Sequence, residues 1–249
     1  MTFHHYVEQI ESLYQNHGGQ VPSVLPPLQD RVTGSLSRIL IIAPHPDDEC
    51  LMAGLALRAK RELGAEVAVL PFSFGSATQR RLPREIELTR ALAVLGFDLW
   101  NPRPPGTHEE LTEPELTTAF ESFRPDAILI PHESDAHPTH IRCSKAAKKA
   151  AERFCSLHQV TLSVFESEYW QSMEDPNLLI PLNSELVSTL GEALIHHVGE
   201  VNRNPYHLTL PAWYMDQERR GRERVYGLGS RHAFQSLFSQ LYRFYSITP

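Results

Sequence analysis

Acidic and histidine side chains gather in two short stretches of the sequence, "APHPDDE" at 43–49 and "ESDAHPTH" at 133–140. Catalytic zinc commonly takes two histidines and one carboxylate from the protein and leaves a fourth position for water. His45, Asp48 and His140 can supply such a set. The two stretches together therefore predict a metal site.

Asp47 precedes Asp48 directly, and adjacent residues in a turn point in different directions. Asp47 is then free to face the water that the metal activates. A metal lowers the pKa of water and polarises a carbonyl, while a carboxylate within hydrogen-bond reach removes the proton. The doublet thus predicts a hydrolase in which Asp47 is the general base.

Simpler interpretations exist for each stretch alone. Acidic residues at a helix start often only cap the helix and balance its dipole. A single His-x-x-His loop is commonly a surface feature. Here both stretches follow an aliphatic run, and Pro46 and Pro138 stiffen the turn after His45 and His137. This joint occurrence favours the metal site.

Strand and helix patterns alternate along the chain. We expect strands at 37–44, 66–74, 126–132 and 160–168, and helices at 51–64, 84–96, 113–123 and 139–154. This alternation predicts an α/β fold with a mostly parallel sheet covered by helices on both faces. Ligands gather at the carboxyl ends of such strands, where both histidine stretches fall. Nearer the C-terminus we expect helices at 183–198 and 233–245, joined by a loop containing proline and tryptophan.

The domain organisation is read from composition. Residues 1–30 are expected to form a short helix and a proline-rich connector, and residues 31–249 a single domain.

The net charge of -7 argues against nucleic acid as a partner. No run is apolar enough to span a membrane, and no leader is evident. Three cysteines fit neither a metal motif nor an even disulfide set, which favours the cytoplasm. A homo-oligomer is compatible with the sequence.

Two other classes of protein fit less well. A dinucleotide-binding module would have Gly-x-Gly-x-x-Gly after the first strand, where this chain has Pro44 to Glu49. A metal-stabilised scaffold without turnover would more often close its site with four protein ligands.

The two stretches, as a pair, resemble the PIG-L/LmbE family of zinc-dependent deacetylases, which act on N-acetylglucosaminyl substrates. Weaker likenesses are the helix "REIELTRALAVLG" and the segment "ALIHHVGE", which contains His197. The resemblance implies a Rossmann-like fold, with zinc bound by His45, Asp48 and His140 and with Asp47 as the general base. It further implies that His137 stabilises the oxyanion or protonates the leaving amine, and that Arg84 faces the substrate.

The expected function is therefore removal of an acetyl group from an N-acetylated aminosugar. The alternative is a zinc amidase that cleaves a larger acyl group or conjugate from an aminosugar. Arg80 and Arg81 lie near Arg84 in sequence and could contact hydroxyl or phosphate groups, although a solvated helix start is the simpler interpretation. Tyr206 or Trp213 could stack on a sugar, but core packing is the favoured use.

The chain departs from the family pattern at two places. Thr139 stands where the family usually has an aspartate beside the first histidine, and Asp135 or Glu133 is a candidate replacement for that carboxylate. After the second strand only Gly75 remains of the family's Thr-x-Gly-Glu. Both changes concern the substrate pocket more than the metal.

Overall fold

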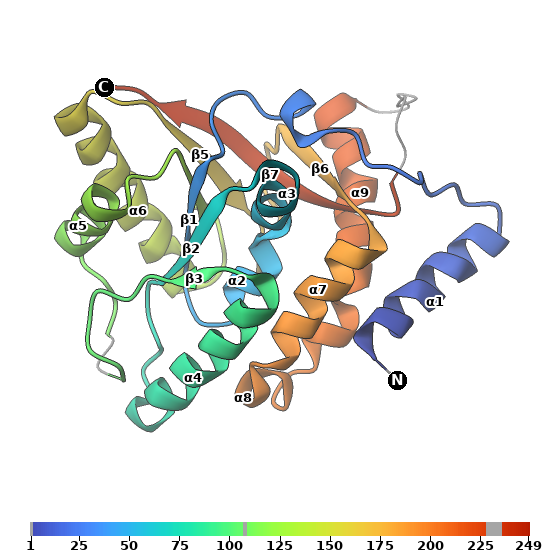
Figure 1. Ribbon diagram of the computed structural model, residues 1–249, viewed down its shortest axis with the longest axis horizontal. Helices are drawn as coiled ribbons and strands as arrows, with labels where there is room; N and C mark the ends of the chain where they lie inside the picture. The colour runs from blue at the N-terminus through green and yellow to red at the C-terminus, as the bar shows by residue number, and fades with distance from the viewer. Residues whose placement is uncertain (1, 107–108, 228–235) are drawn as a thin grey trace.

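The computed structural model describes residues 2–106, 109–227 and 236–249. Its centre is a seven-stranded sheet in the order β3-β2-β1-β4-β5-β7-β6 (Figure 1). The strands β1 to β5 pair in parallel, whereas β7 runs antiparallel to both β5 and β6. Their bounds are β1 Arg38–Ala43, β2 Glu66–Pro71, β3 Asp98–Leu99, β4 Ala127–Pro131, β5 Leu162–Ser167, β6 Leu178–Leu182 and β7 Phe238–Ile247. The predicted mostly parallel α/β sheet is confirmed.

Alternate residues of β1, an interior strand of the sheet, enter two separate cores. Ile39 and Ile41 of β1 face one cluster of buried apolar side chains, and Leu40 and Ile42 face the other. This period of two, with apolar residues in both phases, is typical of a strand covered on both faces. The helices that supply the cover are α1 Phe3–Asn16, α2 Asp48–Met52, α3 Gly54–Leu63, α4 Thr78–Leu95, α5 Glu113–Phe123, α6 Pro138–His158, α7 Ser184–Ile195, α8 Val198–Val201 and α9 Leu210–Tyr226.

The two faces carry different helices. Buried side chains of α5 and α6 share one core, and those of α2, α3, α4 and α7 share the other. Figure 1 shows α5 and α6 on one side of the sheet, away from α7 and α9. Local sequence fixes several helix ends: a capping box of Thr112 and Glu115 begins α5, and left-handed Gly64 and Gly96 end α3 and α4.

The single helix expected at 51–64 is divided into α2 and α3 at Ala53. Side chains of the C-terminal strand bond to the backbone at the break. The Gly54 N–H donates to Gln240 Oε1 at 2.8 Å, and the Tyr242 hydroxyl donates to the Met52 carbonyl at 2.7 Å. Backbone groups that a continuous helix would pair internally are therefore satisfied by side chains 186 and 190 residues away.

The C-terminal prediction was wrong in two respects. The described part of the segment expected to be helical at 233–245, residues 236–245, lies almost wholly in strand β7, and residues 233–235 lie outside the described residues. Its phenylalanine and tyrosine side chains suit a strand between β5 and β6 better than a helix. The expected loop with proline and tryptophan forms helix α9, with Pro211 in its first turn where a missing N–H costs nothing.

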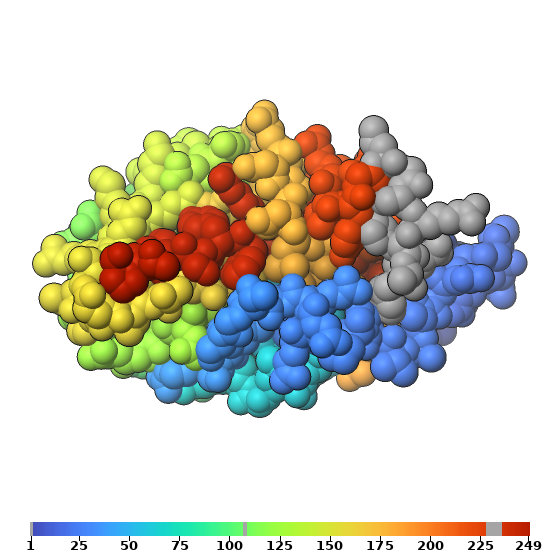
Figure 2. All heavy atoms as spheres, turned by 90° about the horizontal axis from the view of Figure 1, so that it is seen from above, coloured from blue at the N-terminus to red at the C-terminus, as the bar shows by residue number. Residues whose placement is uncertain are grey.

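The N-terminal helix α1 packs against α7. Phe3 and Val7 are buried in the same core as Leu190 and Leu194. In Figure 2 the N-terminal segment runs along one side of the molecule, and the C-terminal part of β7 reaches the surface in the same view. Among the described residues, none of the helices combines the length and apolar character that crossing a lipid bilayer requires.

Candidate active site

Two loops from neighbouring parallel strands form the site. The segment 44–47 links β1 to α2, and the segment 132–137 links β4 to α6. Because β1 and β4 are hydrogen-bonded in parallel, both loops leave the same edge of the sheet. This brings together the two histidine stretches, which lie about 90 residues apart in the sequence.

The side chains of His45, Asp48 and His140 are in mutual contact. Asp48 Oδ2 lies 3.2 Å from His45 Nδ1 and 3.3 Å from His140 Nε2. Burial opposes the ionisation of Asp48, but the charge of His140 and hydrogen bonds from both histidines hold its pKa well below the usual range. A buried carboxylate between two imidazoles is a donor set suited to zinc.

Asp135 supports His140 from the other side. Its Oδ1 lies 3.5 Å from His140 Nδ1 and accepts the His137 N–H at 2.7 Å, and its Oδ2 accepts the Trp170 N–H at 3.1 Å. Burial favours a neutral His140 ring, but Asp48 and Asp135 outweigh it and raise the pKa of His140 to about 10. A carboxylate behind a metal-binding histidine typically fixes its orientation and tautomer.

His137 is half-buried beside the other two histidines. One ring nitrogen from each of His45, His137 and His140 lies within 4.8 Å of the others. The Thr139 N–H donates to His137 Nδ1 at 3.2 Å, so a neutral His137 ring carries its proton on Nε2. Burial and the charges of His140 and His45 lower the pKa of His137. His137 is therefore arranged as a neutral hydrogen-bond donor.

The carboxylate missing at position 139 is not replaced next to the His137 ring by either candidate. Asp135 contacts the His137 backbone, and its nearest imidazole nitrogen is that of His140. Glu133 Oε1 pairs with Lys148 Nζ at 2.9 Å.

Asp47 has a strained backbone, with φ 119° and ψ -33° at the start of α2. Positive φ is uncommon for residues other than glycine and often marks a functional position. The Tyr206 hydroxyl donates a hydrogen bond to Asp47 Oδ2. Burial and the adjacent Asp48 raise the pKa of Asp47 well above its usual range. The doublet is thus split, since Asp48 contacts the histidines and Asp47 contacts Tyr206.

The backbone of Asp47 is held by a buried pair. The Asp47 N–H donates to Glu49 Oε2 at 2.8 Å, and Glu49 Oε1 lies 2.6 Å from His197 Nε2. Glu49 and His197 are both completely buried. Glu49, the third acid of the run, therefore fixes the turn that positions Asp47, the first.

Arg84 lies on the wall of the site and is held by protein groups. Its Nε donates to Glu200 Oε1 at 3.1 Å and its Nη1 donates to the Phe74 carbonyl at 3.0 Å, while Nη2 also bonds to Glu200. Arg80 packs over Gly199, where a side chain would collide with the guanidinium. Figure 1 shows α4, which carries both arginines, beside α8.

Two cavities open at the Asp47–Asp48 doublet. The first, of about 700 Å³, is polar; its wall includes His45, His137, Thr139, Arg81, Arg84 and Arg142. The second, of about 540 Å³, has aromatic walls that include Tyr169, Trp170, Tyr206 and Trp213. We call them the arginine cavity and the aromatic pocket. Tyr206 and Trp213 pack against the core, as the sequence analysis favours. They also line the aromatic pocket, which that interpretation left out.

Sequence reasoning named Asp135, Tyr206 and His197 but missed the contacts that they make at the site. Asp135 lies two residues before His137, a spacing that could have indicated its backbone contact. Tyr206 and the contact of His197 with Glu49 carried no usable local signal, because their partners lie 159 and 148 residues away.

Several solved structures share this fold. One is the N,N'-diacetylchitobiose deacetylase from Pyrococcus horikoshii, which is 16% identical with a TM-score of 0.63; the match covers 88% of this chain and 85% of that one. An A40926 pseudoaglycone deacetylase is 18% identical with a TM-score of 0.58, covering 86% and 98%. The 4-carboxy-2-hydroxymuconate hydratase from Pseudomonas putida is 16% identical with a TM-score of 0.64, covering 86% and 97%.

These identities are low, so the likenesses show the fold alone. A hydratase stands among them, which means that the fold does not by itself specify deacetylation. No curated protein matches the chain. Residues 40–151 match the family described as PIG-L: GlcNAc-PI de-N-acetylase, a stretch that contains both histidine motifs and Arg84. Residues 40–151 of the chain therefore match the PIG-L family, the one that its histidine motifs resemble.

Proposed function

We propose that the protein is a zinc-dependent hydrolase that removes the acetyl group from an N-acetylglucosaminyl substrate. The observation that carries the proposal is the split of the doublet, with Asp48 against His45 and His140 and Asp47 turned to Tyr206. The family match supports a hydrolytic N-deacetylase. Three buried free cysteines support a reducing, cytoplasmic setting.

His45, Asp48 and His140 would hold the metal. The fit rests on the donor set: one carboxylate oxygen already lies within 3.3 Å of both imidazoles, and Asp135 backs His140. When bound, zinc polarises the amide carbonyl and lowers the pKa of water. His137 keeps its proton on Nε2 and is not counted as a ligand.

Asp47 would take the proton from the attacking water. Its raised pKa suits a general base, because a carboxylate with a pKa nearer neutrality holds the proton better in the transition state. His137 Nε2–H would donate to the oxyanion or to the leaving amine. Arg84 would contact the sugar, since three of its five N–H groups bond to protein and two remain.

The test combines metal analysis with acetate release. Purified protein should hold about one zinc per chain, as a single site of three protein ligands predicts. It should release acetate from at least one of free, phosphorylated, nucleotide-linked or oligomeric N-acetylglucosamine. A chelator should abolish the release, and added zinc or another divalent ion should restore it. Full activity in protein shown to be free of metal would refute the zinc assignment, and no release from any substrate by zinc-loaded protein would refute the deacetylase.

A further inference from the structure

The aromatic pocket is not needed for an acetyl group. A methyl group is close in size to a water molecule, whose share of liquid volume is about 30 Å³. The pocket measures about 540 Å³ and reaches the same two aspartates as the arginine cavity. A substrate whose amide lies at the doublet can therefore extend into both spaces.

The side chains that line the aromatic pocket are held in place by contacts within the protein. Leu51 of α2 is buried, and Tyr169 bonds through its hydroxyl to the Asp48 carbonyl at 3.4 Å. Trp213 of α9 stacks on Tyr214 with ring centroids 6.4 Å apart and planes 9° apart. Trp170 is 65% exposed at the mouth, with Arg203 and Asn204 as a polar rim. Side chains held in this way form a surface suited to an apolar ligand.

The two cavities differ in chemistry. An N-acyl aminosugar likewise has a polar sugar half and an apolar acyl half. The arginine cavity offers charged and hydroxyl groups, including Arg81, Ser73 and Thr139, for the hydroxyls of a sugar. The aromatic pocket combines Leu51 and four aromatic rings, an apolar surface that an alkyl chain can bury, with polar lining residues that include Glu200 and Thr209. Of the two cavities, His137 lines only the arginine cavity. A sugar bound there would place its leaving amine on the same side as His137, the expected proton donor.

We propose that the aromatic pocket binds the acyl chain and that, besides the acetyl compound, the protein hydrolyses N-acyl aminosugars whose acyl group is longer than acetyl. The proposal rests on the proposed hydrolase function. Water adds its oxygen to the carbonyl carbon, the C–N bond breaks, and the amine takes up a proton. The products are a medium-chain carboxylate and the free aminosugar.

The first experiment is a chain-length series. N-acetyl, N-butanoyl, N-hexanoyl and N-octanoyl glucosamine derivatives are hydrolysed by zinc-loaded protein, and amine release gives kcat/KM. Each methylene that enters an apolar pocket should raise kcat/KM by up to about fourfold until the pocket is filled. Hydrolysis of the acetyl compound with a fall of tenfold or more at each longer chain would overturn the acyl pocket and leave the deacetylase intact.

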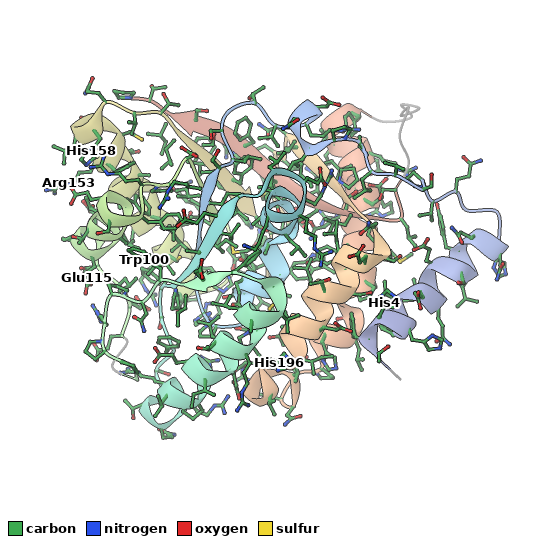
Figure 3. All side chains as sticks on the ribbon, in the orientation of Figure 1. His4, Trp100, Glu115, Arg153, His158 and His196 are labelled. Carbon is green, nitrogen blue, oxygen red and sulfur yellow. The ribbon has the colours of Figure 1, made fainter. Side chains whose placement is uncertain are left out.

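Two variants locate the effect. Trp213→Ala removes a wall, and Thr209→Trp fills the pocket from an exposed position that should tolerate the change. Both should lower kcat/KM for the octanoyl substrate at least tenfold more than for the acetyl substrate. An equal loss on both substrates would mean that the pocket holds the sugar, which refutes the proposal. Trp100→Ala is the matched control, because Trp100 packs on Phe123 at the α5 side of the sheet (Figure 3), and it should leave the chain-length profile unchanged.

A binding measurement separates the pocket from the hydrolysis. Two of the three tryptophans, Trp170 and Trp213, line the pocket, so an alkyl chain there should change the intrinsic fluorescence. The octanoyl compound should bind more tightly than the acetyl compound. If tight binding is seen without any turnover, the hydrolase assignment fails while the apolar site stands. If the fluorescence and affinity are the same for both chain lengths, the acyl site is disproved.

Discussion

His197 Nε2 lies 2.6 Å from Glu49 Oε1, and neither side chain reaches solvent. Burial alone would lower the pKa of His197, but the charge and hydrogen bond of Glu49 outweigh it and raise that pKa. Glu49 in turn accepts the Asp47 N–H. A buried pair on α2 and the start of α8 thus supports the turn on which the expected general base stands.

Breaking this pair should be costly. His197→Ala would leave the Glu49 carboxylate buried without its partner, and we expect the free energy of unfolding in urea to fall by about 3–5 kcal/mol. The neighbouring His196, labelled at the end of α7 in Figure 3, is the control. His196→Ala should change the free energy of unfolding by no more than about 0.5 kcal/mol. Equal stability of the two variants would show that Glu49 is satisfied without His197.

Substitutions of Asp47 and Asp48 should have different effects on zinc binding and turnover. Asp48→Ala removes a metal ligand and should lower zinc affinity and activity together. Asp47→Asn keeps the size of the side chain but cannot accept a proton, so zinc should stay bound while turnover falls roughly 100-fold or more. Zinc content and acetate release measured on both proteins decide the matter. Parent-like turnover in Asp47→Asn would remove Asp47 from the role of base.

Zinc affinity should depend steeply on pH. A histidine must be neutral to bind zinc. Burial favours the neutral form of His140, but Asp48 and Asp135 outweigh burial and raise the pKa of His140 to about 10. Binding near neutral pH therefore displaces a proton, and the apparent affinity should fall by at least about tenfold for each pH unit of acidification. Competition with a chromophoric chelator between pH 6 and 8 measures the slope. A flat profile would mean that His140 does not bind the metal.

The hydrogen bond from Tyr206 should lower the pKa of Asp47, the expected general base. This bond opposes the pKa increase caused by burial and by Asp48. In Tyr206→Phe the pKa of Asp47 should rise further, so the acidic limb of the rate profile should move to higher pH, by about one unit. Tyr245→Phe, which breaks the 3.2 Å bond to Glu166 far from the cavities, is the control and should leave the limb in place. A shift to lower pH would contradict the assignment of that limb to Asp47.

Thr139→Asp tests the departure from the family pattern. Burial and neighbouring positive charge lower the pKa of His137, and an added carboxylate should raise it. The limb of the rate profile that reports His137 should move to higher pH while zinc content stays the same. An unchanged profile in zinc-loaded protein would show that His137 works without a tuning carboxylate.

The sequence predicts the part of the fold that is locally encoded. Aliphatic runs such as Ile39 to Ile42 predict strands, and the two loops after β1 and β4 predict which histidines meet. The C-terminal region was harder, because Leu237, Leu241 and Tyr245 repeat with a helical period although the segment is a strand. Its conformation depends on an available position between β5 and β6, which is a long-range property.

The same limit applies to the site. The ligand set predicted from His45, Asp48 and His140 needs only two loops and the rule for strand ends, and these side chains do lie together. The Tyr206 contact and the Glu49 pair need the path of the chain after α7, which no local pattern specifies. Long-range hydrogen bonds are the part of the site that a reading of motifs leaves out.

The break between α2 and α3 bears on the order of events during synthesis. Gln240 and Tyr242 supply the bonds that the backbone at 51–55 requires, and they are synthesised almost 190 residues after it. The β1–α2 segment, which carries Asp47 and Asp48, therefore lacks its final support until β7 has been synthesised. A nascent chain that stops just before β7 would contain every predicted metal ligand and still lack the strand that fixes the helix behind them.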